Sequence, residues 1–168
     1  ENGSVIARRE AKLKSAGRAD ALAHLAARPE VAEEEALNRA LAFARFTGAR
    51  LHVAHVSAAP SLALLRAAKS EGMDVTAETC PHYLLLGAEE MRLAGGQKLR
   101  VNPPLRAARN QAPLARALAD GALDMVATDH APHLPVEKTA ASVWDCACGL
   151  PGLETLLPLM LTEAAEGR

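Results

Sequence analysis

VAEEEALNRALAFARFTGARLHVAHVS, residues 31–57, changes its hydrophobic period within one short stretch. Over residues 31–47 the apolar side chains recur at the spacing of one helix face. These side chains are Ala36, Leu37, Ala40, Leu41 and Ala44. Pro29 precedes this segment and Gly48 follows it, and both are typical of helix boundaries. Residues 49–57 are apolar and β-branched apart from two histidines, so the stretch predicts a helix followed by a buried strand.

The same alternation continues along the rest of the chain. Helices are expected at residues 61–70, 109–119 and 153–165, and strands at residues 73–79 and 121–129. Strands that are separated by helices pair in parallel through right-handed crossovers. The sequence therefore predicts an α/β fold.

Composition narrows the possible functions. The chain has 168 residues, 49% hydrophobic residues and a net charge of −1, so it can bury the core of one domain. The nearly neutral charge disfavours nucleic acid or an anionic membrane as a partner and favours a small molecule. The sequence has neither a long apolar run nor a signal-peptide pattern, and we expect a cytoplasmic location. The three cysteines form no CxxC pair, and we interpret them as thiols.

Titratable residues follow the ends of all three expected strands. His55 ends the first strand, residues 78–82 end the second and residues 129–133 end the third. Because the carboxyl ends of parallel strands meet at one rim, we expect these residues to converge. Imidazole and carboxylate groups suit zinc, which lowers the pKa of bound water to about 7, and a neighbouring carboxylate can take the proton. This combination indicates hydrolysis of an unactivated amide.

The same residues also have structural interpretations. A histidine on a strand is more often packed or hydrogen-bonded than a ligand, and we interpret His52 as structural because it alternates with His55 across the strand. His82 could brace a turn after a proline, and Asp129 could cap a helix. His24 is expected on a solvent-exposed helix or loop. Convergence of several residues on one rim favours the catalytic interpretation.

Five ordered blocks of the chain resemble the cyclic amidohydrolases of the amidohydrolase superfamily, namely dihydroorotases, allantoinases and hydantoinases. The blocks are LHVAHVS (51–57), DVTAETCPHYLLL (74–86), VNPPLR (101–106), VATDHAPH (126–133) and GLPGLETLLPLML (149–161). The resemblance covers essentially the whole chain. It implies a (β/α)8 barrel with one or two metal ions, usually zinc, that hydrolyses the cyclic amide bond of a ureide-type ring.

The resemblance also implies roles for individual residues. His55 and Asp129 match metal ligands of the family, and Asp129 also matches the residue that shuttles the proton. The residues that match substrate contacts are Asn102, His133 and the backbone at Cys148 and Gly149. The residues expected to support the metal ligands are Glu78, His82 and His130.

Other ligands of the family have no counterpart in the chain. A His-x-His pair, a carboxylated lysine and a fifth-strand histidine are missing, and the family places this last histidine just before a stretch like residues 1–3, ENG. We therefore expect residues 1–168 to be a partial metal-dependent amidohydrolase domain, the C-terminal part of the barrel from about strand 6 to strand 8. Two ligands cannot hold a zinc ion that takes four. We therefore expect catalytic activity in the complete protein, and we expect that protein to be a homo-oligomer.

The blocks also bear on the substrate. Asn102 within VNPPLR and His133 within TDHAPH are most similar to dihydroorotases, whereas ENG at residues 1–3 is more similar to allantoinases and hydantoinases. We expect a dihydroorotase, which interconverts dihydroorotate and N-carbamoyl-aspartate in pyrimidine biosynthesis, with allantoinase or hydantoinase/dihydropyrimidinase as the alternative. An alternative of another class is a non-catalytic relative with a structural or regulatory role. Retention of both His55 and Asp129 argues against it.

Overall fold

Three short strands form a parallel sheet in the order β1-β2-β3. In the computed structural model, which describes residues 1–167, they are β1 (Leu51–Val53), β2 (Val75–Thr79) and β3 (Met125–Val126). Leu51 is aligned with Val75, and Glu78 is aligned with Met125. The predicted parallel pairing of three strands is confirmed.

The strands are shorter than the sequence pattern predicted, for local reasons. Residues 121–123 were predicted in the third strand, but they form the turn after the helix at Gln111–Ala119. The amide of Leu123 donates to the carbonyl of Ala117 in this helix over 2.8 Å. The sheet hydrogen bonds nevertheless extend past the strand ends, because the amide of Val56 donates to Glu78 and that of Ala127 to Thr79. The segments that follow β1 and β3 thus remain hydrogen-bonded to the end of β2.

Helices separate the strands and follow the sheet. The four predicted from the sequence are present as α3 (Glu30–Thr47), α4 (Pro60–Ser70), α6 (Gln111–Ala119) and α7 (Leu156–Ala165). A shorter helix, α5 (Pro81–Leu85), begins directly after β2, with proline at its first position, where its missing N–H costs nothing. No helix within residues 1–167 is long and apolar enough to cross a membrane.

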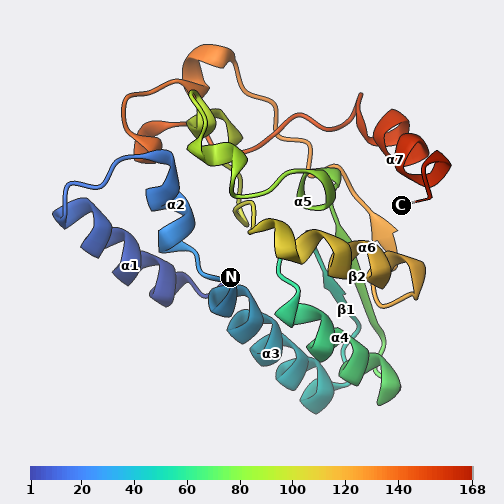
Figure 1. Cartoon of the computed structure of the whole chain (residues 1–168). Helices are drawn as coiled ribbons and strands as arrows, with labels where there is room; N and C mark the ends of the chain where they lie inside the picture. The colour runs from blue at the N-terminus through green and yellow to red at the C-terminus, as the bar shows by residue number, and fades with distance from the viewer. Residues whose placement is uncertain (168) are drawn as a thin grey trace.

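The core lies between the sheet and helices α3, α4 and α6. Its buried side chains include Leu37 and Leu41 from α3, Leu62 and Leu65 from α4, Leu114 and Ala117 from α6, and Val75 and Ala77 from β2. Figure 1 shows α4 and α6 in front of β1 and β2. Leu65 and Leu114 are completely buried, and each such side chain stabilises the fold by about 1.5–3 kcal/mol.

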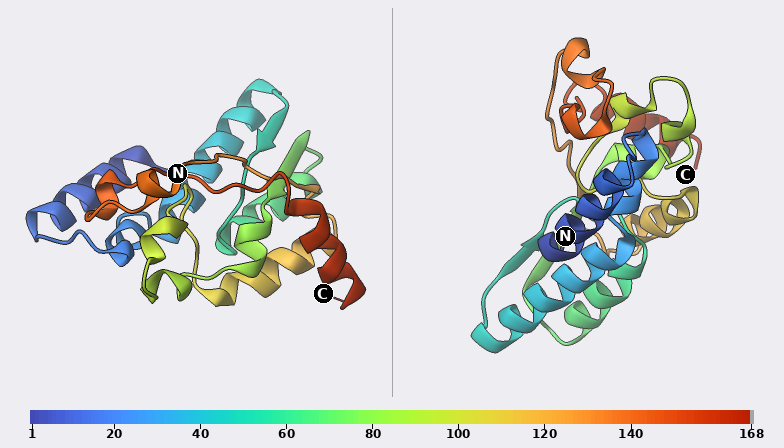
Figure 2. Two further views of the ribbon diagram at one scale, coloured as in Figure 1. Left: turned by 90° about the horizontal axis from the view of Figure 1, so that it is seen from above. Right: turned by 90° about the vertical axis from the view of Figure 1, so that its left-hand side faces the viewer.

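Two helices that the sequence pattern did not predict precede α3. They are α1 (Gly3–Ser15) and α2 (Ala21–Ala27), and Asn2 and Asp20 cap them by accepting backbone N–H groups. Helix α1 has few apolar residues, and Ile6 is its only buried one. The described residues also include five short 3-10 turns: η1 (Glu90–Arg92), η2 (Gly96–Leu99), η3 (Ala108–Asn110), η4 (Pro135–Lys138) and η5 (Val143–Asp145). Figure 2 shows α1 and α7 at opposite ends of the molecule.

His24 is buried within α2, so the prediction of an exposed position was wrong. Its side chain is 1% exposed, and its Nε2 lies 3.0 Å from the carbonyl oxygen of Val101. A neutral imidazole with its proton on Nε2 donates to this oxygen. Burial lowers the pKa of His24 to about 4. The histidine therefore joins α2 to the VNPPLR segment as an uncharged group.

Replacing His24 by Gln should remove a pH dependence of stability. The pKa of His24 falls from 6.5 to about 4 on burial, so the unfolded chain binds a proton that the folded chain rejects. The stability contributed by the neutral side chain is complete above pH 6.5 and is lost as the pH falls, by about 2 kcal/mol between pH 7.5 and pH 5. Urea unfolding of both proteins at these two pH values measures the difference. If the difference in unfolding free energy between wild type and His24→Gln is the same at both pH values, the interpretation is wrong.

Candidate active site

His55 and Asp129 occupy similar places at the ends of two strands. His55 follows β1 and Asp129 follows β3. Their φ angles are 43° and 44°, and within residues 1–167 they are the only residues other than glycine with a positive φ. This left-handed conformation costs about 1–2 kcal/mol per residue, so the surrounding structure must impose it. Backbone strain therefore marks the two residues that the sequence resemblance identifies as metal ligands.

Buried polar atoms without a hydrogen-bond partner also concentrate on predicted site residues. Within residues 1–167 these side-chain atoms are His55 Nδ1, His82 Nε2, Asn102 Oδ1 and Arg100 Nε. Three of the four belong to residues that the sequence analysis selected. An unpaired buried polar atom costs about 1–3 kcal/mol, so such atoms are uncommon unless they serve a purpose. Ring nitrogens and an amide oxygen of this kind can bind a metal ion or a ligand that residues 1–167 do not themselves provide.

His82 is a neutral imidazole in this arrangement. Burial, and to a smaller extent the neighbouring His55, lower its pKa to about 4. The ring also contacts Tyr83 edge to face, with centroids 4.2 Å apart. His82 therefore lies near His55 with an uncharged ring nitrogen.

Asp129 lies beside a buried thiol and does not cap a helix. Within residues 1–167 no helix or turn of helix begins at Asp129, and the next one begins at Pro135, so the capping interpretation was wrong. Burial, together with the charge of Asp129, raises the pKa of Cys80 to about 12. Burial also raises the pKa of Cys148. All three cysteines are free, which confirms the interpretation as thiols.

Glu78 binds His52 in this structure. The Nε2 atom of His52 lies 3.1 Å from Glu78 Oε2, and its Nδ1 atom lies 2.8 Å from Thr76 Oγ1. His52 and Thr76 are aligned neighbours on β1 and β2. His52 is therefore hydrogen-bonded across the sheet, as expected for a structural histidine, although its side chain is partly exposed.

The TDHAPH segment runs beside the segment that contains Gly149. The amides of Gly152 and Leu153 both donate to His130 Nδ1 over 3.1 Å. On the other side, His133 Nε2 lies 3.1 Å from the carbonyl oxygen of Cys148. His133, Cys148 and Gly149, three of the predicted substrate contacts, are thus brought together.

Arg100, two residues before Asn102, connects the VNPPLR segment to the same group. The amide of Gly149 donates to the carbonyl oxygen of Arg100 over 3.0 Å. Asn102 itself precedes Pro103 through a cis peptide bond, and its side-chain oxygen is buried and unpaired. The VNPPLR segment therefore approaches the loop that carries the other predicted substrate contacts.

Known proteins with similar sequences or structures identify the family. No protein-family model matches the chain. The dihydroorotase of Desulfotalea psychrophila is 47% identical over 139 residues, which cover 83% of this chain and 32% of that protein. The allantoinase of Streptomyces avermitilis is 46% identical over 142 residues, or 83% of this chain and 31% of that protein. The chain belongs to the cyclic amidohydrolase family.

Solved amidohydrolase structures share the fold of this chain. The dihydropyrimidinase of Brevibacillus agri matches with a TM-score of 0.95 at 32% identity, over 99% of this chain and 38% of that one. The L-hydantoinase of Arthrobacter aurescens matches with a TM-score of 0.93 at 36% identity, over 99% of this chain and 37% of that one. The chain spans about a third of the length of the curated relatives it matches.

Two residues of the chain have side chains of the kinds that bind metal ions. No group of three or more His, Cys, Asp or Glu side chains in the described residues could hold a metal ion. His55 nevertheless offers a buried ring nitrogen without another partner, and Asp129 offers a carboxylate. Both are donor types that zinc accepts. These two residues fit as members of a site to which other segments of an amidohydrolase would contribute.

Two basic side chains that the sequence analysis missed support the loop around Gly149. Lys138 is buried and donates to the carbonyl oxygens of Arg100, Ala147 and Gly149 over 2.9, 3.1 and 2.7 Å. Burial lowers the pKa of Lys138. Arg100 donates to the carbonyl oxygens of Trp144 and Cys146. No pattern in the sequence indicated these roles, because all the acceptors are backbone atoms.

Replacing Gly149 by Ala should loosen the contact between the two loops. An added Cβ would lie 2.5 Å from the Cβ of Ala131, and the φ of 140° would strain any side chain. Gly121 is a matched control because its φ is 79° but nothing lies within 4 Å of an added Cβ. Hydrogen exchange by mass spectrometry should rise in residues 129–133 and 148–152 for Gly149→Ala. Equal exchange there for Gly149→Ala and Gly121→Ala would show that the steric contact is unimportant.

Proposed function

We propose that this chain supplies one part of the active site of a zinc-dependent cyclic amidohydrolase, and that the complete protein is a dihydroorotase. The observation that carries the proposal is the pairing of strain with an unsatisfied atom at His55. Its backbone is left-handed and its buried Nδ1 has no partner within residues 1–167. Both features cost stability, and a bound metal ion would compensate for them.

The proposed architecture is the C-terminal part of a (β/α)8 barrel, about strands 6 to 8 with their helices, formed by residues 1–168. Two observations support it. Within residues 1–167, β1 and β3 each have only one strand neighbour. The side chains of Leu157 and Leu161 on α7 are exposed, which suits a helix that packs against further elements. A cytoplasmic location and a homo-oligomeric complete protein stay predictions.

The side chains of this chain have separate tasks in the proposed reaction. A bound zinc ion would polarise the ring amide and lower the pKa of water. His55 would hold the metal through its unpaired nitrogen. Asp129 would bind the metal and take the proton of the attacking water at its carboxylate, and then return it to the ring nitrogen that leaves.

Substrate positioning falls to a second group of residues. The unpaired Oδ1 of Asn102 would accept a hydrogen bond from a ring N–H. His133 uses Nε2 to bind the Cys148 carbonyl, and its Nδ1 lies 3.9 Å from Glu137 Oε2. As an imidazolium, which has two N–H donors, His133 would turn Nδ1–H to the carboxylate of dihydroorotate instead. The backbone at Cys148 and Gly149 would contact the ring. Glu78, His82 and His130 would support the metal-binding and substrate-binding residues without binding the metal or the substrate themselves.

The proposal of dihydroorotase has a close alternative. The dihydroorotase and allantoinase relatives are almost equally similar, at 47% and 46% identity. The similar solved structures carry the names dihydropyrimidinase and hydantoinase. These names favour allantoinase or hydantoinase as the second candidate. Of the three substrates, only dihydroorotate carries a ring carboxylate, and this group distinguishes it from the other two.

Substitutions of the two proposed ligands in the complete protein should separate metal binding from proton transfer. His55→Ala should lose bound zinc, measured by metal analysis, because an imidazole ligand is removed. Asp129→Asn keeps the size and one coordinating oxygen but removes the base, so turnover should fall at least about 100-fold in the folded protein. Unchanged zinc content in His55→Ala would refute the ligand assignment. Near-normal turnover in Asp129→Asn would refute the proton transfer role.

Substitution of His133 should identify the substrate. His133→Ala in the complete protein should raise the KM for dihydroorotate roughly 10- to 100-fold, the effect of losing one charged hydrogen bond, with little change in zinc content. His133→Gln is the matched control, because its amide can still donate to the Cys148 carbonyl but carries no charge. Wild type and both variants are assayed on dihydroorotate, allantoin and hydantoin. A wild type that turns over only allantoin or hydantoin would replace dihydroorotase by the alternative.

A further inference from the structure

A buried carboxylate on α3 binds the chain immediately after His55. Glu33 is 9% exposed, and its Oε1 accepts the amides of Ser57 and Ala58 over 3.2 and 3.0 Å. The same oxygen accepts the hydroxyl of Ser61 over 2.9 Å. The other oxygen, Oε2, accepts the hydroxyl of Ser57. One carboxylate thus receives four hydrogen bonds from residues 57–61.

A buried guanidinium completes this group. Arg106, the last residue of VNPPLR, is 6% exposed, and its Nε donates to Ser57 Oγ over 3.0 Å. Its terminal nitrogen lies 3.3 Å from Glu33 Oε2 and 3.4 Å from Glu1 Oε1. It also donates to the carbonyl oxygen of Arg28. Arg106 therefore connects three of the blocks noted in the sequence, namely ENG, HVS and VNPPLR.

The end of β2 holds the same short segment from the other side. The amide of Val56 donates to the carbonyl oxygen of Glu78 over 2.7 Å. The hydroxyl of Thr79 donates to the carbonyl oxygen of Val56 over 2.7 Å. With the bonds to Glu33, the amides of three consecutive residues after His55 are all fixed. This arrangement can impose the left-handed backbone of His55, which would relax in a loosely held chain.

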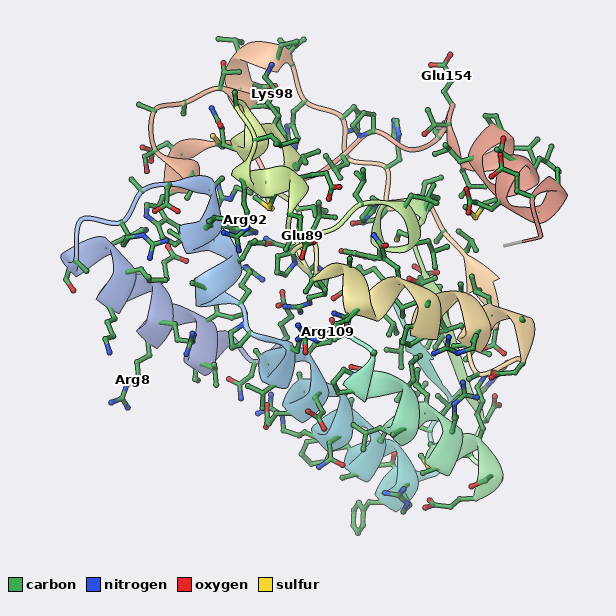
Figure 3. All side chains as sticks on the ribbon, in the orientation of Figure 1. Arg8, Glu89, Arg92, Lys98, Arg109 and Glu154 are labelled. Carbon is green, nitrogen blue, oxygen red and sulfur yellow. The ribbon has the colours of Figure 1, made fainter. Side chains whose placement is uncertain are left out.

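A second carboxylate on α3 acts on the next residue. The amide of Ala59 donates to Asn110 Oδ1 over 2.8 Å, and Asn110 Nδ2 donates to Glu30 Oε1 over 2.9 Å. Arg109 binds the same Glu30 oxygen over 2.7 Å. Figure 3 shows Arg109 at the junction of α3 and α6. The first turn of α3 therefore fixes residues 57–59 through two of its acidic side chains.

Stability alone is a poor explanation for the buried ion pair between Glu33 and Arg106. Removing two charges from water is costly, and apolar side chains of similar size often stabilise a protein equally well. An ion pair with several directed hydrogen bonds restricts geometry more tightly than apolar packing does. Here the restricted segment adjoins His55, and Arg106 lies four residues beyond Asn102 in the same block.

We propose that Glu33 and Arg106 are positioning residues that fix the imidazole of His55 by holding residues 56–58, and that this pair sets the affinity of the site for zinc. The inference rests on the proposed function, because it takes His55 as a metal ligand. The proposal gives neither side chain a contact with the metal or the substrate. Their effect passes through the backbone that follows His55.

The test compares zinc affinities in the complete protein. Glu33→Gln keeps the size of the side chain but removes the charge that faces Arg106 and replaces one acceptor oxygen by a donor. The zinc dissociation constant, measured by competition with a chromophoric chelator, should rise about 10- to 100-fold, as expected when the support of a metal ligand is lost. Excess zinc should restore turnover, because the reacting groups are unchanged.

Two serines provide a matched pair of milder variants. Ser57→Ala removes the hydroxyl that joins Glu33 to Arg106 next to His55. Ser61→Ala removes one bond to the same carboxylate, but from helix α4. Zinc affinity should fall more in Ser57→Ala than in Ser61→Ala. This comparison decides the matter if Glu33→Gln does not fold.

Lys69 provides a control for general loss of stability. Its ammonium lies 2.7 Å from Asp124 Oδ2 and donates to the carbonyl oxygen of Gly121 over 3.0 Å, and neither partner belongs to the proposed site. Lys69→Gln should lower the melting temperature of the metal-free protein without changing the zinc dissociation constant. A change in zinc affinity of the same size in Lys69→Gln as in Glu33→Gln would show that general destabilisation is the cause, and would overturn the proposal.

The remaining outcomes separate this inference from the proposed function. If His55→Ala loses zinc while Glu33→Gln and Ser57→Ala keep the wild-type dissociation constant, His55 is a ligand but the positioning role is wrong. If His55→Ala keeps the wild-type affinity, the metal assignment itself is wrong and the positioning role falls with it. Loss of affinity in Glu33→Gln and Ser57→Ala, with recovery of turnover in excess zinc, supports both.

Discussion

The carboxyl end of β2 is the point on which the arrangement of the site depends. Glu78 accepts the amide of Val56, which follows His55, and Thr79 accepts the amide of Ala127, which precedes Asp129. Because β2 is the middle strand of a parallel sheet, its last two residues bind the segments that follow β1 and β3 at the same end of the sheet. The two strained residues are therefore presented from either side of one strand, although they are far apart in sequence.

The loops beyond this edge are fixed by two different electrostatic arrangements. After His55, the short segment presents N–H groups, and a carboxylate on α3 accepts them. Around Gly149, the long irregular loop presents carbonyl groups, and Lys138 donates to three of them. Buried backbone groups that have no strand or helix partner need a side chain of the complementary kind. The sign of each buried charge therefore follows from which backbone groups the loop turns inward.

The hydrophobic period predicted the elements that pack against the sheet, but not the structures that depend on distant contacts. Helices α3, α4, α6 and α7 were found because each has an apolar face or an apolar run. Helix α1 was missed because it has few apolar residues, and α2 because it has only seven residues and is held by a distant contact, the bond from His24 to Val101. The proposed ligands could be selected from the sequence by residue type and motif. Glu33 and Arg106 could not, because they are 73 residues apart and only the fold brings them together.

The open edges of the sheet are consistent with the proposed barrel. Open strand edges and exposed leucines are features that isolated domains avoid, because they promote association with other chains. Within residues 1–167, β1 and β3 each offer one free edge, and leucines of α7 are exposed. In the proposed barrel, these surfaces would be buried against segments that the relatives have and that this chain does not span. Under the proposed function, those segments would supply the other metal ligands, while this chain would determine how His55, Asp129 and the substrate loop are oriented.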